Sequence, residues 1–126
     1  MTTLERLGAE QYVLLTTFRK DGREVATPVW VVRDGDALGV WTVADSGKVK
    51  RIRRSGAVTV APCDVRGRPR GEAVPGTAGI VDAAARDRLR DLLRRKYGIT
   101  GRLVMLGSRL RRGKDGTVGI RITVTE

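Results

Sequence analysis

The sequence predicts a mostly β fold: a small, mostly antiparallel β-barrel of six or seven short strands with two or three flanking helices. Short runs rich in β-branched and aromatic residues recur along the chain, separated by Gly, Asp and Pro turn signals. The 126 residues suit a single domain, residues 1–126, with a modest core. An apolar content of 40% is ordinary for a globular protein and argues against extensive disorder.

The strand signals follow one another in order. The run YVLLTTFR ends at a Lys-Asp-Gly turn, and EVATPVWVVR ends at Asp34-Gly35, a strong hairpin signal. Pro75 lies in a later run and is tolerated best at an edge or bulge position. The expected strands are residues 12–19, 24–33, 37–43, 57–64, 71–81, 102–106 and 117–125, with a basic turn around residues 112–116 before the last.

Two helices flank these strands. Thr2 to Glu5 matches a capping box, and Gly8 closes a short N-terminal helix. Residues 82–97 form the clearest helix, which Asp82 caps and Gly98 terminates, with its arginines and aspartates on the polar face at pairing distance. Its apolar face consists of Ala85, Leu89, Leu92, Leu93 and Tyr97.

A third, basic helix lies in the segment 41–54 (WTVADSGKVKRIRR), the most informative stretch of the chain. Ser46 is its expected N-cap, and Gly56 is the expected stop signal. Val49 and Ile52, three residues apart, are expected to face the core. The segment therefore predicts a strand, a small polar turn and a short helix.

Lysines in the first turn of this helix have the wrong sign for the helix dipole, whose positive end prefers negative charge. Lys48 and Lys50 lie where a bound phosphate would relieve that mismatch. A solvated basic turn is the alternative, because the penalty is only about 0.3–1 kcal/mol at an exposed site.

The overall charge also favours anionic partners. The 25 basic residues exceed the 14 acidic ones and give a net charge of +11. Phosphorylated cofactors, nucleic acid and acidic membranes all fit this charge. We expect no nucleic-acid partner, because the chain has only five aromatic residues and no motif that reads RNA or DNA.

Several function classes are excluded by composition. Without histidine the chain has no Ser–His or Cys–His nucleophile and no histidine-ligated metal, and the single Cys63 rules out a structural zinc site. We therefore expect no metal. No signal peptide or membrane-spanning run is evident, so we expect a cytoplasmic protein without membrane association. If it is an enzyme, the difficult chemistry belongs to an organic cofactor.

The order TPVWVV, hairpin, WT, SGKVKRIRR and VTVAPCD resembles the flavin- and deazaflavin-binding split-barrel family related to pyridoxamine-phosphate oxidase. The segments VTVAPCDVRGRPRGEAV and GRLVMLGSRLRRG are similar to its actinobacterial, F420-dependent branch. The resemblance implies a six-stranded antiparallel split barrel of the FMN-binding type. It also implies a homodimer that binds its cofactor in a groove between subunits.

The resemblance further implies a set of cofactor-binding residues. Thr27, Pro28, Val29 and Trp30 would run beside the ring, and Trp41 and Thr42 would lie near the ring and its ribityl chain. Ser46, Gly47, Lys48 and Lys50 would surround the phosphate. The strand carrying Thr59, Ala61, Pro62 and Cys63 would pass beneath the ring or contribute across the dimer. Arg51, Arg53, Arg54 and the Arg66-Gly67-Arg68 loop would hold the glutamate tail of F420.

The expected function is therefore hydride transfer between reduced F420 and an electron-poor small-molecule substrate, with catalytic residues not assigned. The alternatives are an FMN-dependent oxidoreductase on the same fold and a non-catalytic F420 carrier. Gly47 stands where FMN-binding members usually carry an arginine, which weakens the FMN alternative. The lack of histidine makes vitamin B6 oxidation improbable.

Each of these residues also has a purely structural interpretation. Trp30 and Trp41 suit a core as well as a cofactor contact, and Pro28 marks either a bulge or an ordinary edge strand. Cys63 fits a buried strand position better than a redox thiol. Gly39 either opens space near the ring or is a strand irregularity.

Overall fold

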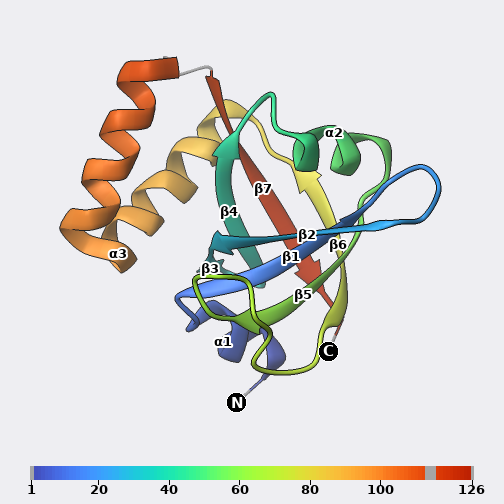
Figure 1. Cartoon of the computed structure of the whole chain (residues 1–126). Helices are drawn as coiled ribbons and strands as arrows, with labels where there is room; N and C mark the ends of the chain where they lie inside the picture. The colour runs from blue at the N-terminus through green and yellow to red at the C-terminus, as the bar shows by residue number, and fades with distance from the viewer. Residues whose placement is uncertain (1, 113–115, 126) are drawn as a thin grey trace.

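The computed structural model describes residues 2–112 and 116–125. These residues form seven strands and three helices (Figure 1). The elements are α1 (Thr3–Gly8), β1 (Tyr12–Phe18), β2 (Glu24–Trp30), β3 (Val32–Asp34), β4 (Ala37–Val43), α2 (Gly47–Arg54), β5 (Ala57–Cys63), β6 (Val74–Ile80), α3 (Ala83–Arg112) and β7 (Thr117–Val124).

The strands form one curled antiparallel sheet in the order β2-β1-β5-β6-β7-β4-β3. The two edge strands, β2 and β3, follow each other directly in the chain, and only Val31 separates them. This arrangement is a split barrel, so the predicted fold class is confirmed. The described residues form seven strands, not the six that the resemblance implies: the run predicted as residues 24–33 divides at Val31, and the predicted strand 102–106 is helical.

The interior of the barrel is filled by alternate residues of the strands. Val13 and Leu15 on β1 are fully buried, as are Val40 on β4 and Ile120 on β7. The helices α1 and α2 lie at opposite ends of the barrel (Figure 1). Val49 and Ile52 of α2 are buried as the sequence predicts, so the basic residues of this helix are left at the rim.

The long helix α3 packs on the outside of the barrel, mainly against β7, β3 and β4. Leu89 is 1% exposed, and its side chain occupies space that Gly39 on β4 and Gly119 on β7 leave open. A Cβ added to Gly39 would lie 2.2 Å from Leu89 Cδ2. Gly39 therefore admits a helix side chain. No helix of the described residues has the length and apolar character needed to cross a membrane.

The predicted N-terminal caps of two helices, Thr2 for α1 and Asp82 for α3, are confirmed. The Thr2 hydroxyl accepts the backbone N–H of Glu5 at 3.1 Å, and Asp82 Oδ1 accepts that of Ala85 at 2.9 Å. These bonds satisfy N–H groups that have no partner within the helix.

Other boundary predictions are wrong. Residues 102–106 belong to α3 and form no strand, because a short apolar run between glycines has no period that separates strand from helix. Gly98 does break the helix, with φ 65° and ψ −143°, but a second helical segment follows it. The strand predicted from residue 71 begins at Val74. The predicted turn at residues 112–116 lies largely outside the described residues.

Replacing Gly39 by alanine tests the approach of α3 to the sheet. The new methyl group must displace the buried Leu89 side chain, so we expect Gly39→Ala to lower the free energy of unfolding by about 1–3 kcal/mol. Chemical denaturation measures this. Gly79→Ala is the matched control: it lies on β6 with no atom within 4 Å of the added Cβ, and we expect a change below about 0.5 kcal/mol. Equal stabilities of the two variants would contradict the packing.

Candidate functional site: a cationic corner between β4 and α2

The corner where β4 ends and α2 begins brings together Thr42, Ser46, Gly47 and Lys48. Thr42 ends the inward-facing row of β4, and its hydroxyl accepts a hydrogen bond from Lys48 Nζ at 3.1 Å. Ser46 is in the N-cap position with extended backbone, as the sequence predicts. The predicted phosphate-binding residues therefore do meet at one point, apart from the exposed Lys50 one turn along.

The Ser46 hydroxyl is the unusual group in this corner. Its Oγ is buried, and among the described residues it has neither a capping bond nor any other hydrogen-bond partner. Buried polar groups are almost always paired, and an unpaired one costs about 1–3 kcal/mol. The first turn of α2 contains no acidic residue that could take up its free N–H groups. The corner thus offers donors to an anion, which is what a phosphate requires.

Lys48 supplies the positive charge of the corner. Its side chain is half-buried, and burial, together with the nearby charge of Arg51, lowers the pKa of the ammonium below its usual value. A bound anion would offset both effects, because an opposite charge favours the protonated amine. The electrostatics of Lys48 therefore favour an anion beside it.

The sequence predicted Arg51 only as a contact of the glutamate tail of F420, whereas the structure also places it beside Gly47 in the corner. Its Nε donates to the hydroxyl of Thr17 on β1 at 2.6 Å, which anchors the guanidinium at the barrel rim. Its Nη1 would lie 2.7 Å from a Cβ added at residue 47. Glycine at position 47 therefore lets a fixed guanidinium reach the start of the helix. The Arg51–Thr17 hydrogen bond joins segments far apart in the sequence, so residue spacing could not indicate it.

Arg51 also joins the corner to a basic cleft. The cleft has a volume of about 300 Å³, and the described residues that line it are all cationic: Arg19, Lys20, Lys50, Arg51 and Arg54. The charges of Arg19 and Arg54, after burial itself, lower the pKa of Arg51. Mutual repulsion of this kind favours a polyanionic ligand.

The other predicted tail residues lie elsewhere. Arg53 is exposed and does not line the basic cleft. Arg66 and Arg68 follow β5, whereas α2 precedes it, so the loop lies at the other end of this strand. Arg68 is also paired with Asp64, at 2.8 Å. Within one chain, the loop and the cleft do not form one site.

The predicted ring contacts on β2 lie along an edge of the sheet. Thr27, Pro28, Val29 and Trp30 are all half-buried and pair regularly with β1, so Pro28 is an edge-strand proline without a bulge. The Trp30 ring stacks on Tyr97 of α3, with centroids 4.4 Å apart and planes 6° from parallel.

Trp41 also packs beside α3. It belongs with Trp30 to the cluster of partly buried side chains around Leu89 and Leu93. Both tryptophans thus have a structural role, and both remain half-buried at the surface of that cluster.

The β5 residues form a row across the middle of the sheet. Thr59 is half-buried, whereas Ala61, Pro62 and Cys63 are buried. Burial and the Asp64 charge raise the pKa of the Cys63 thiol, which argues against a reactive thiolate. Cys63 pairs with Tyr12 on β1, which in turn pairs with Trp30, so these β5 and β2 positions share one row.

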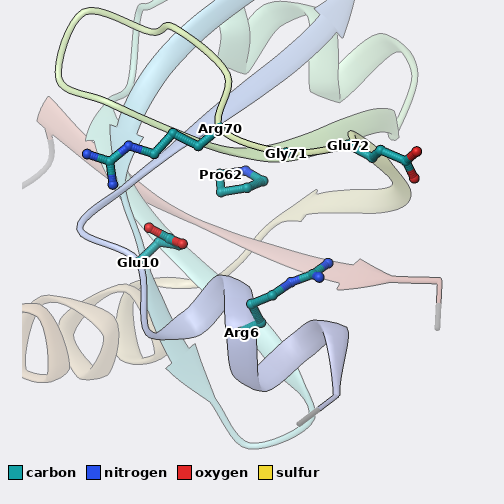
Figure 2. Close-up of a pocket in the computed structure, with 6 residues that line it drawn as sticks. All are labelled: Arg6, Glu10, Pro62, Arg70, Gly71 and Glu72. Atoms are coloured by element: carbon teal, nitrogen blue, oxygen red, sulfur yellow. The ribbon is translucent and has the colours of Figure 1, made fainter.

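Pro62 lies at a second hollow, at the α1 end of the barrel. This hollow has a volume of about 330 Å³, and its rim carries charges of both signs (Figure 2). Its lining residues are Arg6, Glu10, Pro62, Arg70, Gly71 and Glu72. It is remote from the β4–α2 corner, because α1 and α2 occupy opposite ends of the barrel (Figure 1). No sequence pattern indicated this hollow, since residues 6–10 and 70–72 meet only in the fold.

The sheet order and the cationic β4–α2 corner place the chain in the class of split-barrel proteins. The chain matches the family described as pyridoxamine 5'-phosphate oxidase over residues 2–126, and it belongs to that family. No curated protein matches the sequence.

Several solved structures share the fold at low sequence identity. A conserved hypothetical protein, Rv2991, from Mycobacterium tuberculosis is 22% identical with a TM-score of 0.73, covering 100% of this chain and 82% of its own. A protein described as an F420 reductase is 19% identical with a TM-score of 0.61, covering 100% and 96%. An FAD-binding protein from Mesorhizobium loti is 18% identical with a TM-score of 0.66, covering 100% and 91%.

The Ser46→Ala variant tests whether the Ser46 hydroxyl contributes to the stability of the protein. Because Ser46 Oγ has no hydrogen-bond partner in the part of the chain that the structure describes, we expect Ser46→Ala to leave the free energy of unfolding within about 0.5 kcal/mol of wild type, or to raise it. Thr2→Ala is the matched control, since it removes a capping bond and should cost about 1 kcal/mol. Chemical denaturation compares them. A loss at Ser46 equal to that at Thr2 would mean that the serine already caps its helix.

Proposed function

We propose that this protein is an F420-dependent oxidoreductase that transfers a hydride between the deazaflavin and an electron-poor small molecule. The observation that carries the proposal is the corner of Ser46, Gly47 and Lys48. A buried hydroxyl with no partner among residues 2–112 and 116–125, free helix N–H groups and a half-buried ammonium converge there. This donor set fits the cofactor phosphate. Membership of the family and the similarity to an F420 reductase support the choice of cofactor.

The basic cleft supports F420 over a simple flavin nucleotide. F420 carries a glutamate tail beyond its phosphate, and the cleft begins at Arg51, which also reaches Gly47. A ligand with its phosphate in the corner can thus extend its carboxylates over Lys50 and Arg54. Charge-assisted hydrogen bonds to these carboxylates would add affinity.

The residues of the chain would bind and orient the cofactor, which supplies the hydride chemistry when bound. The edge strand β2, with Thr27 and Trp30, would lie along the ring. Trp41 and the β5 residues would complete the groove, in part from a second subunit. Orientation is the main requirement for hydride transfer, so the absence of histidine is no obstacle.

A flavin-dependent oxidoreductase is the second candidate, favoured by the similarity to an FAD-binding protein. Purification separates the two: a yellow protein with flavin absorbance supports the flavin enzyme, whereas a colourless protein that binds added deazaflavin supports ours. Tight F420 binding without turnover of quinone, enone or nitro acceptors would indicate a carrier.

The phosphate assignment predicts a specific loss of affinity. Lys48→Ala removes a charge-assisted hydrogen bond worth about 1.5–3 kcal/mol, so we expect F420 to bind about 10- to 100-fold more weakly. Arg95→Ala is the charge-matched control, because it removes one exposed positive charge of α3 and should leave the affinity near wild type. Deazaflavin fluorescence anisotropy measures both, and equal affinities of wild type and Lys48→Ala would refute the phosphate site.

The same titration tests whether the glutamate tail of F420 lies in the basic cleft. Lys50 is exposed and lines the basic cleft, so Lys50→Ala should weaken binding of the full cofactor but not of a form that lacks glutamates. If Lys50→Ala binds both forms as wild type does, the tail lies elsewhere while the phosphate site stands.

We also propose that the protein is a homodimer. The outward face of β1 carries half-buried apolar side chains, among them Leu14 and Phe18, and Val65 in the adjacent loop is 61% exposed. A second copy of the chain would cover this face and complete the groove beside β2.

Sedimentation velocity tests the dimer. We expect wild type to sediment as a dimer at micromolar concentration and Val65→Asp to dissociate at least tenfold more readily, because it places a charge in an apolar contact. Ala84→Asp, which adds the same charge at an exposed position of α3, is the control. A wild-type monomer at these concentrations would refute the proposal.

A further inference from the structure

The last two residues of α3 before Gly98 direct their polar groups at backbone atoms of the barrel. Lys96 Nζ donates to three carbonyl oxygens: those of Gly8 at 2.9 Å, Glu10 at 2.5 Å and Val31 at 2.6 Å. An ammonium has three N–H donors, so all three are used.

Tyr97 binds the same part of the chain. Its hydroxyl donates to the carbonyl oxygen of Gln11 at 2.6 Å and accepts the backbone N–H of Val31 at 3.1 Å. Its ring stacks on Trp30, the residue that precedes Val31.

The backbone N–H and C=O groups of Val31 need hydrogen-bond partners from outside the sheet. It lies between β2 and β3, outside both strand pairings, and it is fully buried. A buried backbone N–H and C=O without partners would cost several kcal/mol, and here the helix supplies both partners.

We propose that Lys96 and Tyr97 are positioning residues that hold the Trp30–Val31 corner of the barrel. The corner is the end of β2, so on the proposed function the pair also sets one wall of the cofactor groove. The positioning of the corner itself does not depend on that function.

The ammonium offers one N–H to each of the three carbonyls. Burial lowers the pKa of Lys96 to about 8, and the charge of Glu10 opposes this shift. Burial raises the pKa of Tyr97 to about 12, so Tyr97 keeps its proton where Lys96 loses it.

Raising the pH should not release the corner. The unfolded lysine, with a pKa of 10.5, binds its proton more tightly than the folded one. Between pH 8 and 10.5 the unfolded chain therefore binds more protons, and the contribution of Lys96 to the free energy of unfolding rises with pH. The corner is therefore tested by substitution at a fixed pH.

Trp30 reports on the corner once Trp41, the other tryptophan, is replaced. In Trp41→Phe at pH 7 we expect Lys96→Met, which removes all three N–H donors, to red-shift Trp30 emission and increase its acrylamide quenching. Tyr97→Phe, which keeps the stacked ring but removes the hydroxyl bonded to Val31, should have the same effect. Arg95→Met, which removes an exposed cation of the same helix, is the control.

Trp30 emission and quenching that stay as in Trp41→Phe alone in both variants would overturn the proposal. If the methionine variant does not fold, Tyr97→Phe decides, because it leaves Lys96 and the stacked ring in place. The measurement uses no cofactor, so it stands or fails independently of F420 binding.

Discussion

Leu89 lies where Gly39 and Gly119 leave room in the outer face of β4 and β7, and this contact decides where α3 packs. The same helix, two turns further on, provides the partners that the backbone of Val31 lacks. The glycines of the sheet and the polar end of the helix therefore act together. Closer packing brings Lys96 and Tyr97 within hydrogen-bond distance of the β2–β3 junction, where the sheet has no ladder of its own.

At the opposite end of the barrel, the constraint is an excess of positive charge. Burial of Val49 and Ile52 orients α2 so that its cations remain at the rim, and no acidic residue stands in its first turn. Thr17 and Thr42 hold Arg51 and Lys48 by their side chains, which reduces the entropy that an anion must overcome on binding. Placing fixed cations around free helix N–H groups destabilises the chain alone and favours an anionic ligand.

Local patterns predicted much of this molecule. The caps at Thr2 and Asp82 and the Ser46 corner depend on neighbouring residues, so sequence alone identified them. Contacts across long separations were not predictable in this way: Arg51 meets Thr17, and the basic cleft gains Arg19 and Lys20, only through strand pairing. The run 102–106 was misassigned because its apolar pattern fits either helix or strand, and only packing decides.

The two free edges of the sheet belong to consecutive strands, and this has a consequence for the behaviour of the protein at high concentration. An edge strand with open N–H and C=O groups can recruit strands from other molecules and so begin aggregation. Here β3 is only three residues long, and Pro28 removes one donor from β2. An incoming strand thus finds little continuous edge to extend, which protects a highly charged small barrel from cross-β assembly.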